Sequence, residues 1–335
     1  MRLFKRLLLL CLLAAIGFSG WMAWFAFAAV PLKVNPRGAV DFDIRPGLGL
    51  KGAASVMVAT GVDFMPWQFA LLGRLAGMDR NIKAGSYEVV AGVTPWDLLQ
   101  KLTLGDVTQT ELVLVEGRTF RQFRAQIDAH ADLRHDTMGL SDAELLQRLG
   151  IADAHPEGLF FPDTYLFAKQ SSDLAILARA HEAMQRRLAA EWDKRDTSVP
   201  YKSPYQALIM ASIVEKETGL EADRGKVASV FVNRLRRGML LQTDPTVIYG
   251  MGLTFDGNIR KRDLTADTPW NTYTRAGLPP TPIAMPGLAS IQAALRPPAT
   301  DFLYFVARGD GSSVFSRTLE EHNRAVTRYQ RGGRG

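Results

Sequence analysis

Glu215 is the residue in this 335-residue chain whose sequence surroundings best suit acid–base chemistry. It follows the stretch 206–214, in which only Gln206 and Ser212 are polar, so its carboxylate is expected to be partly desolvated. It also falls in the last turn of a predicted helix, where the helix dipole disfavours negative charge. Both effects favour a general acid near neutral pH. The alternative is a surface glutamate paired with a basic residue at a helix end.

Glu217 is the rival carboxylate on the same predicted helix. Two residues along a helix correspond to a rotation of about 200°, so the two side chains cannot readily line one pocket. We therefore expect Glu215, not Glu217, to be the acid.

Other kinds of catalytic group are scarce in the sequence. The single cysteine, Cys11, lies in an apolar N-terminal stretch, so the rest of the chain can form no disulfide, cysteine nucleophile or thiolate metal site. The five histidines show no HxxxH spacing, and no GxSxG or SxxK motif is present. Any chemistry must therefore be carried by carboxylates and neutral polar groups.

A long stretch over 238–287 is predicted to be mostly irregular and rich in Gly, Pro, Thr and Asn. Loops of this length inside a compact domain are usually functional. This one carries amides, hydroxyls and aromatic rings suited to binding carbohydrate: Gln242, Asp244, Tyr249, Asn271 and Tyr273. The alternative is that these side chains bond within the loop itself.

The elements that would position these residues are helices and a hairpin. Ser203 is a predicted N-cap with Pro204 at the first helical position, and the helix over 205–214 is apolar on nearly every side, so it should be buried. A second helix over 223–237, a hairpin of strands 302–307 and 314–315, and a closing helix over 319–329 complete this region.

The first half of the chain repeats a strand, a glycine-containing turn and a helical stretch. The predicted strands cover 40–44, 85–90 and 110–115, and they indicate one or two small β-α-β modules that share a sheet. The following region is richer in helix, including a long amphipathic helix over 172–192. The predicted division is 1–32 for a membrane anchor, 38–116 for the β/α module, 117–202 for a helical connection and 203–329 for the region around Glu215.

The N-terminus reads as a transmembrane anchor. No charged residue occurs over 7–30, which is long enough to cross a hydrocarbon core of ~30 Å. Arg2, Lys5 and Arg6 precede this run and favour a cytoplasmic N-terminus, with the remainder of the chain outside the cytoplasm. A cleaved signal peptide is the alternative, because Ala26-Phe27-Ala28 resembles a cleavage site.

The net charge is mild once the anchor is set aside. Without its three flanking basic residues, the 40 Lys and Arg fall to 37 against 34 acidic residues, a net charge of +3. This balance does not argue for nucleic acid. It suits an anionic polymer or membrane surface, or simple solubility.

Several longer motifs together resemble the YceG-like family of endolytic murein transglycosylases. They are KAGSY (83–87), EGLFFPDTY (157–165), ASIVEKE (211–217), VASVFVNRL (227–235), LQTDPTVIYG (241–250), and NTY (271–273) followed by GLPPTPI (277–283). The resemblance runs from about residue 38 to 325. One departure is Met285, where many relatives would carry Asn, so a hydrogen bond from that side chain is in doubt.

The resemblance implies an α+β protein. Its parts would be one N-terminal transmembrane helix, a LysM-like β/α module, and a mainly helical, lysozyme-like catalytic domain with long loops and a β-hairpin. It implies an inner-membrane, single-pass protein with a periplasmic catalytic domain. The implied partners are peptidoglycan strands, the membrane and cell-wall synthases, with no nucleic acid.

The implied reaction cleaves the MurNAc–GlcNAc β-1,4 bond within peptidoglycan strands, leaves 1,6-anhydro-MurNAc ends and terminates nascent strands. The catalytic glutamate falls on Glu215, with Gln242, Asp244, Asn271 and Tyr273 around it. One carboxylic acid suffices because the nucleophile is the substrate's own C6 hydroxyl, and no metal or organic cofactor is needed. Two alternatives remain: a non-catalytic wall-binding scaffold, and a hydrolytic muramidase that uses Asp244 as second carboxylate.

Overall fold

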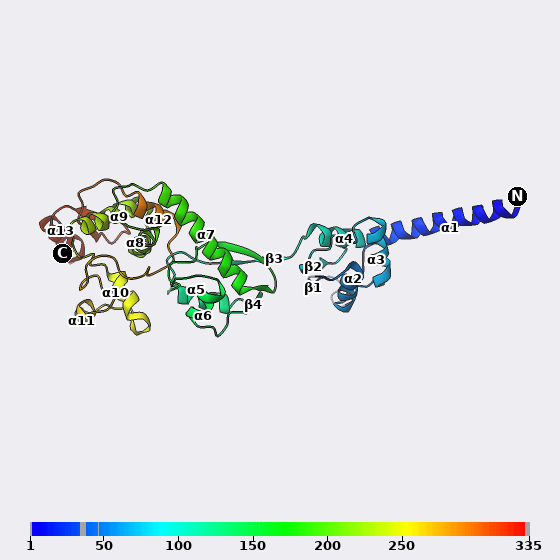
Figure 1. Ribbon diagram of the computed structural model, residues 1–335, viewed down its shortest axis with the longest axis horizontal. Helices are drawn as coiled ribbons and strands as arrows, with labels where there is room; N and C mark the ends of the chain where they lie inside the picture. Colours follow the sequence, from blue (N-terminus) through cyan, green and yellow to red (C-terminus); the bar gives the residue numbers. More distant parts are fainter. Residues whose placement is uncertain (1, 34–37, 46, 154, 332–335) are drawn as a thin grey trace. The chain divides into compact units, whose positions relative to one another are not determined.

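The protein combines helices and strands in two compact units. The computed structural model describes residues 2–33, 38–45, 47–153 and 155–331. Unit 1 contains the described residues up to Glu111 together with Leu166–Ser171, and unit 2 contains Leu112–Tyr165 and the described residues from Ser172 onward (Figure 1). The expected mixture of helices and strands is confirmed.

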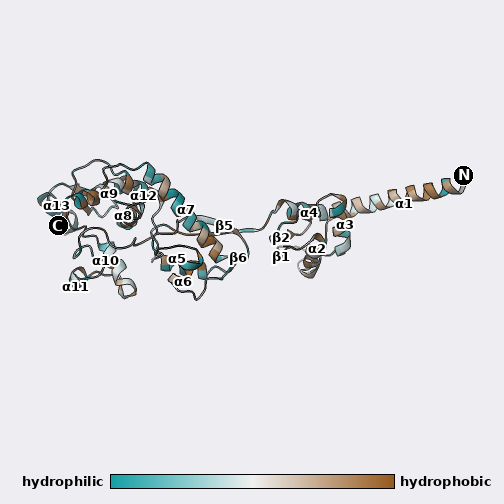
Figure 2. Ribbon diagram, viewed as in Figure 1, coloured by the Kyte–Doolittle hydropathy of each residue, from teal (hydrophilic) through white to brown (hydrophobic). Residues whose placement is uncertain are grey.

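Helix α1 (Arg2–Phe27) carries the predicted apolar run. Within the described residues it is the one helix long and apolar enough to cross a membrane, and Figure 2 shows it largely in the hydrophobic colour. Most of its side chains are exposed, but Phe25 and Ala26 near its C-terminal end are buried in the core of unit 1. The structure therefore fits a single-pass membrane anchor that ends inside a folded unit.

The rest of unit 1 is built on one antiparallel strand pair. Its elements are β1 (Ala39–Ile44), α2 (Leu50–Ala59), α3 (Pro66–Leu75), β2 (Gly85–Val90) and α4 (Pro95–Leu104). Strand β1 pairs with β2, and Phe42 stands opposite Tyr87 with their rings stacked 5.7 Å apart. The order is thus strand, two helices, strand, with the buried faces of both strands turned to the core.

The prediction that the first three strands share a sheet is wrong. Strand β3 (Gln109–Val113) pairs with β5 (Thr164–Ala168), not with β1 or β2. The sequence interpretation also lacked α3, which follows α2 and brings the chain back so that β2 runs antiparallel to β1. A single crossover helix would have favoured parallel strands. The choice of partner depends on residues far along the chain, which local patterns do not contain.

Unit 2 is mainly helical. After β3 come α5 (Phe120–Asp128), β4 (Leu133–Arg134) and α6 (Asp142–Arg148). Strands β5 and β6 (Ser171–Ser172) follow and belong partly to unit 1. The chain continues in unit 2 with α7 (Asp173–Asp193), α8 (Pro204–Glu217) and α9 (Glu221–Arg236). Then follow α10 (Asp244–Met251), the 3₁₀ turn Gly252–Thr254, α11 (Lys261–Thr265), α12 (Leu288–Leu295), β7 (Tyr304–Ala307), β8 (Ser313–Ser316), α13 (Leu319–Val326) and a π-turn over Thr327–Arg331.

Helix α8 is the centre of unit 2. Every side chain over 207–214 is buried, and α7, α9, α10 and α12 pack against it. The predicted buried helix is thus confirmed, as are the antiparallel hairpin β7–β8 and helix α9. The stretch 238–287 is less irregular than expected, because it contains α10 and α11.

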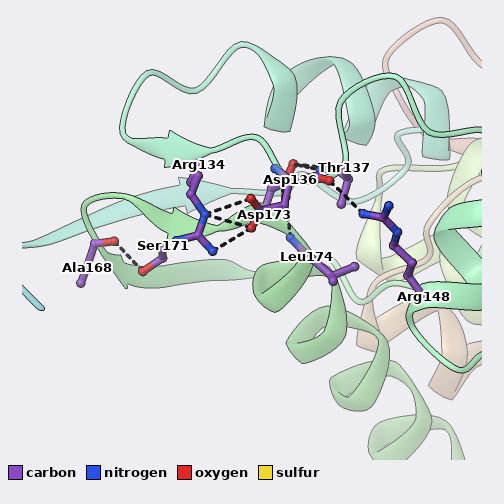
Figure 3. Close-up of polar contacts among 8 residues, drawn as sticks. All are labelled: Arg134, Asp136, Thr137, Arg148, Ala168, Ser171, Asp173 and Leu174. Atoms are coloured by element: carbon purple, nitrogen blue, oxygen red, sulfur yellow. Dashed lines mark hydrogen bonds and ion pairs between the residues drawn. The ribbon is translucent and has the colours of Figure 1, made fainter. Parts of the chain in front are cut away.

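A polar network ties the start of α7 to the segment after β4. The buried carboxylate of Asp173 accepts hydrogen bonds from the backbone of Asp136, Thr137 and Leu174 and from the Thr137 hydroxyl (Figure 3). Beside it, Arg134 forms an ion pair with Asp136, and their hydrogen bond lowers the pKa of Asp136 to about 2. Four hydrogen-bond donors therefore satisfy the buried carboxyl group of Asp173.

Candidate active site

Glu215 lies where the buried helix α8 reaches the surface of unit 2. The helix begins as predicted, with the Ser203 hydroxyl accepting a hydrogen bond from the amide of Gln206. Its apolar run ends at Val214, and the next side chain, Glu215, is partly exposed. The Glu215 Oε2 atom accepts a hydrogen bond from the amide of Gly287 at 3.0 Å. One of the two carboxylate oxygens is thus fixed by a backbone hydrogen bond.

Gly117 lies beside the other oxygen of this carboxylate. Its φ is +75°, and a Cβ there would lie 3.7 Å from Cγ and 3.9 Å from Oε1 of Glu215. In the described part of the chain, no hydrogen bond engages Oε1. Oε1 is therefore not engaged by the described part of the protein, whereas Oε2 is.

Two backbone segments meet beside Glu215. The amide of Gly117 donates to the carbonyl of Met285 at 2.8 Å, and the amide of Met285 donates to the carbonyl of Arg118 at 2.8 Å. Met285 is fully buried, so its backbone, and not its side chain, makes the connection. This pairing holds the 116–118 and 285–287 segments together beside Glu215.

Glu116 is the residue that the sequence interpretation missed. A Cβ on Gly287 would come within 1.8 Å of Glu116 Oε2, so this carboxylate lies directly against the glycine whose amide binds Glu215. Partial burial and then the negative charge of Glu215 raise the pKa of Glu116, and Arg224 opposes the shift. The available signal was the Glu116-Gly117 turn, but only tertiary structure brings it to α8.

Glu217 has different partners, as its place on the helix predicts. The Thr243 hydroxyl donates to its Oε1, and burial, partly offset by that hydrogen bond, raises the pKa of Glu217 to about 7. Asp244, which begins α10, accepts a hydrogen bond from the Tyr273 hydroxyl and adds to the shift at Glu217. Two of the predicted binding residues, Asp244 and Tyr273, thus gather near Glu217.

Tyr249 is hydrogen-bonded to a further buried carboxylate, that of Glu157. Its hydroxyl donates to Glu157 Oε2 at 3.1 Å, while the amide of Phe120 donates to Glu157 Oε1 at 2.9 Å. Burial raises the pKa of Glu157 to about 7, and these two hydrogen bonds oppose it. The ring of Tyr249 meets Trp270 edge to face at 5.4 Å. The hydroxyl of Tyr249 is therefore already engaged in a hydrogen bond within the protein.

Asn271 and Gln242 differ sharply in their surroundings. The Asn271 side chain is buried, donates to the carbonyls of Asp263, Leu264 and Ala266, and accepts from the amide of Tyr273. These bonds give Asn271 the geometry of a residue that shapes its loop. Gln242 is exposed in a left-handed backbone conformation, with φ of +48°.

Among the described residues, one group has ligand atoms close enough to hold a metal ion: Asp128, His135 and Asp173, within 4.8 Å of one another. Asp173 already accepts the four hydrogen bonds of the network described above (Figure 3). The group involves α5 and α7, elements other than the helix that bears Glu215.

A buried helix that carries the partly exposed Glu215 in its last turn, flanked by polar loops, defines a candidate acid–base site on an α+β scaffold. Residues 42–328 match the YceG-like family, and the chain belongs to this family.

Named relatives and a solved structure agree with this membership. An endolytic murein transglycosylase of Bacillus subtilis is 33% identical over 316 residues, which cover 89% of this chain and 87% of the relative. An endolytic murein transglycosylase of Streptococcus pneumoniae is 26% identical, and the match covers 96% of this chain but 64% of that longer protein. The crystal structure of a putative yceG-like protein from Listeria monocytogenes is similar with a TM-score of 0.55 and 30% identity, covering 86% of this chain and 99% of that one.

Proposed function

We propose that this protein is an endolytic lytic transglycosylase of peptidoglycan and that Glu215 is its catalytic acid and base. The observation that carries the proposal is the partly exposed carboxylate in the last turn of α8, which is held at Oε2 by the Gly287 amide and receives no hydrogen bond at Oε1 from the described residues. The names of the relatives from Bacillus and Streptococcus support the reaction class.

The proposed reaction needs one carboxyl group. Protonated Glu215 gives its proton to the glycosidic oxygen as the bond from C1 of MurNAc to that oxygen breaks. The C6 hydroxyl oxygen of the same MurNAc then bonds to C1, and its proton returns to the Glu215 carboxylate. No water is consumed, the enzyme is restored, and the new end is 1,6-anhydro-MurNAc. Such a cut would terminate nascent strands beside cell-wall synthases.

Gln242 is the best-placed of the predicted neutral groups for binding substrate, because its side chain is exposed. An amide of this kind could orient the N-acetyl group of the sugar or stabilise charge in the transition state. Asp244 and Tyr273 are proposed to contact sugar beyond the cleaved bond. Tyr249 and Asn271 would act indirectly, since their polar atoms hold Glu157 and the loop backbone.

The test compares full-length wild type, Glu215→Gln and Glu217→Gln on purified peptidoglycan sacculi. Glu215→Gln keeps the acceptor for Gly287 but cannot deliver a proton, so strand cleavage should fall by ~10²–10⁴-fold or more. Glu217→Gln keeps the acceptor for Thr243 and is the matched control, which should retain much more activity. Thermal unfolding of each variant shows that the fold is retained.

Mass spectrometry of the products separates the alternatives. Anhydro ends, each one water lighter than a hydrolysis product, support the proposal, and reducing ends identify a muramidase. A muramidase would need a second carboxylate. Glu116 lies beside Glu215 and is the candidate for this role, whereas Asp244 accepts a hydrogen bond from Tyr273. Wild-type protein that releases no soluble product would be a scaffold. Activity of Glu215→Gln together with an inactive Glu217→Gln would identify Glu217, not Glu215, as the catalytic acid.

The proposed architecture has a LysM-like glycan-binding module within 38–116 and a lysozyme-like catalytic domain over 203–329, joined by 117–202. The order β1-α2-α3-β2 with antiparallel strands supports the first. A deletion of 39–104 spares β3 and Glu116 and should weaken binding to sacculi. Undiminished binding and turnover would contradict a role in holding substrate.

The proposed location is the inner membrane, with a cytoplasmic N-terminus and a periplasmic catalytic domain. It rests on the long apolar helix α1 and on the basic residues Lys5 and Arg6 near its start. A reporter that works only outside the cytoplasm should be active when fused after Gly38. Activity of a cytoplasm-only reporter at that position would reverse the topology.

A further inference from the structure

The C-terminal end of α1 is built into unit 1. Phe25 is 7% exposed and meets Phe64 edge to face at 6.4 Å. Beyond the helix, the amide of Val30 donates to the carbonyl of Val93 at 2.8 Å, and Leu32 forms a β-bridge with Val62. Because these contacts lie within one compact unit, the helix and the rest of unit 1 are joined as a single body and not by a loose tether.

The segment from Met65 to Trp67 reaches back along this helix. The Trp67 ring stacks on Trp21 with centroids 5.7 Å apart and ring planes 25° apart. Trp21 precedes the helix end at Phe27 by six residues, or about 9 Å at 1.5 Å per residue. Unit 1 therefore overlaps the last part of the predicted membrane span.

The length of the span places this overlap at the edge of the bilayer. The candidate span Phe4–Phe27 has 24 residues, whereas a hydrocarbon core of ~30 Å needs about 20. If the whole excess lay at the C-terminal end, the hydrocarbon edge would fall near Ala23, and Trp21 would still lie inside it. Trp67, stacked on Trp21, then lies at the boundary between hydrocarbon and headgroups.

Exposed apolar side chains gather at this level. Met65 is 60% exposed and Trp67 52%, and on the helix Trp24 and Phe27 are 68% and 66% exposed. Trp is enriched at membrane interfaces, because its apolar ring and polar N–H suit that boundary. Pro66 starts α3 and limits the conformations of this segment, so little ordering is needed on insertion.

We propose that unit 1 sits on the lipid bilayer, with Met65 and Trp67 inserted at the headgroup–acyl boundary beside α1. The partner is the phospholipid surface itself. This inference goes beyond the proposed function: the anchor would set both the distance and the orientation of unit 1 at the membrane, and not merely tether it.

The test uses full-length protein in phosphatidylethanolamine–phosphatidylglycerol vesicles that contain a lipid with a nitroxide near the top of its acyl chain. An environment-sensitive fluorophore is attached at one cysteine at a time. Native Cys11, in the span, reports whether the anchor is in the bilayer. Met65→Cys and Leu104→Cys, each in a Cys11→Ala background, report on unit 1.

Leu104 is the matched control because it is also an exposed apolar residue of unit 1, 72% exposed. Helix α4 begins beside the anchor, where Trp96 meets Phe27 at 5.9 Å. Leu104 follows eight residues later, about 12 Å along the helix. Both substituted side chains are exposed, so the variants should fold.

Strong quenching at position 11 with several-fold more quenching at 65 than at 104 is the expected result. Quenching at 11 with equal, weak quenching at 65 and 104 overturns the inference and leaves the anchor in place. Equal, strong quenching at 65 and 104 shows non-specific adsorption and also overturns it. Absence of quenching at position 11 would show that α1 does not lie in the bilayer, which overturns both the membrane anchor and this inference. Activity on sacculi tests the proposed reaction separately.

Discussion

The carboxylate of Glu116 lies beside that of Glu215, although the two residues come from distant parts of the sequence. Glu215 binds the Gly287 amide, and Glu116 occupies the space that a side chain on Gly287 would need. The negative charge of Glu215 contributes to the raised pKa of Glu116. A second acidic group therefore lies next to the candidate acid, and the pKa of this second group depends in part on that neighbour.

Glu215→Gln tests this contribution. The substitution removes the charge of Glu215 but keeps the shape of its side chain, so the pKa of Glu116 should fall. NMR of the Glu116 carboxyl carbon follows the titration in wild type and in the variant. An unchanged titration of Glu116 in Glu215→Gln would show that the charge of Glu215 does not act on it.

Glu157→Gln should flatten the dependence of stability on pH. The folded-state pKa of Glu157 is about 7, above its ordinary value of 4.5, so the folded protein binds more protons between these values. Stability should then fall as pH rises from about 4.5 to 7 and level off above it, by at most roughly 3 kcal/mol. Glutamine mimics the protonated acid and should remove this loss. Unfolding midpoints at pH 5 and pH 8 measure it.

Tyr249→Phe is the companion to that experiment. It removes the hydroxyl that donates to Glu157, and this hydrogen bond lowers the pKa of the carboxyl group. The fall in stability with rising pH should therefore extend further in this variant than in wild type. Identical pH profiles for all three proteins would mean that Glu157 does not titrate in this range.

Asn271→Ala and Gln242→Ala should separate a loop-shaping residue from a substrate-binding one. The first leaves three backbone carbonyls without their donor, which should cost roughly 1–3 kcal/mol of stability. The second alters an exposed side chain and should leave the unfolding midpoint unchanged while weakening activity. Denaturant unfolding measures the stability of each variant, and turnover on sacculi measures its activity. Lost stability in Gln242→Ala alone would reverse these roles.

Gly158→Ala should be more destabilising than Gly139→Ala. The two glycines have nearly equal φ values, +82° and +81°, so both substitutions carry the same backbone strain. A Cβ on Gly158 would also lie 2.5 Å from the ring of Pro282, whereas nothing lies within 4 Å of one on Gly139. We expect roughly 1–3 kcal/mol more loss at position 158, measured by chemical unfolding. Equal losses would show that the Pro282 segment moves freely.

Local sequence determined where the main helices lie and which glutamate emerges at the end of α8. The N-cap Ser203 and the apolar run that follows act through neighbouring residues, as does the two-residue spacing that turns Glu217 toward Thr243 and away from Gly287. The hairpin β7–β8 is similarly local, because its strands are joined by a short turn.

Tertiary structure alone decided what surrounds those residues. The pairing of β3 with β5, the approach of Glu116 to Glu215 and the use of Asn271 inside its loop all depend on backbone groups far away in the chain. Periodicity and capping report on neighbours within a few residues, whereas a hydrogen bond between the 116–118 and 285–287 segments carries no local signature. The sequence therefore determined that Glu215 emerges in the last turn of α8, and the fold determined its neighbours.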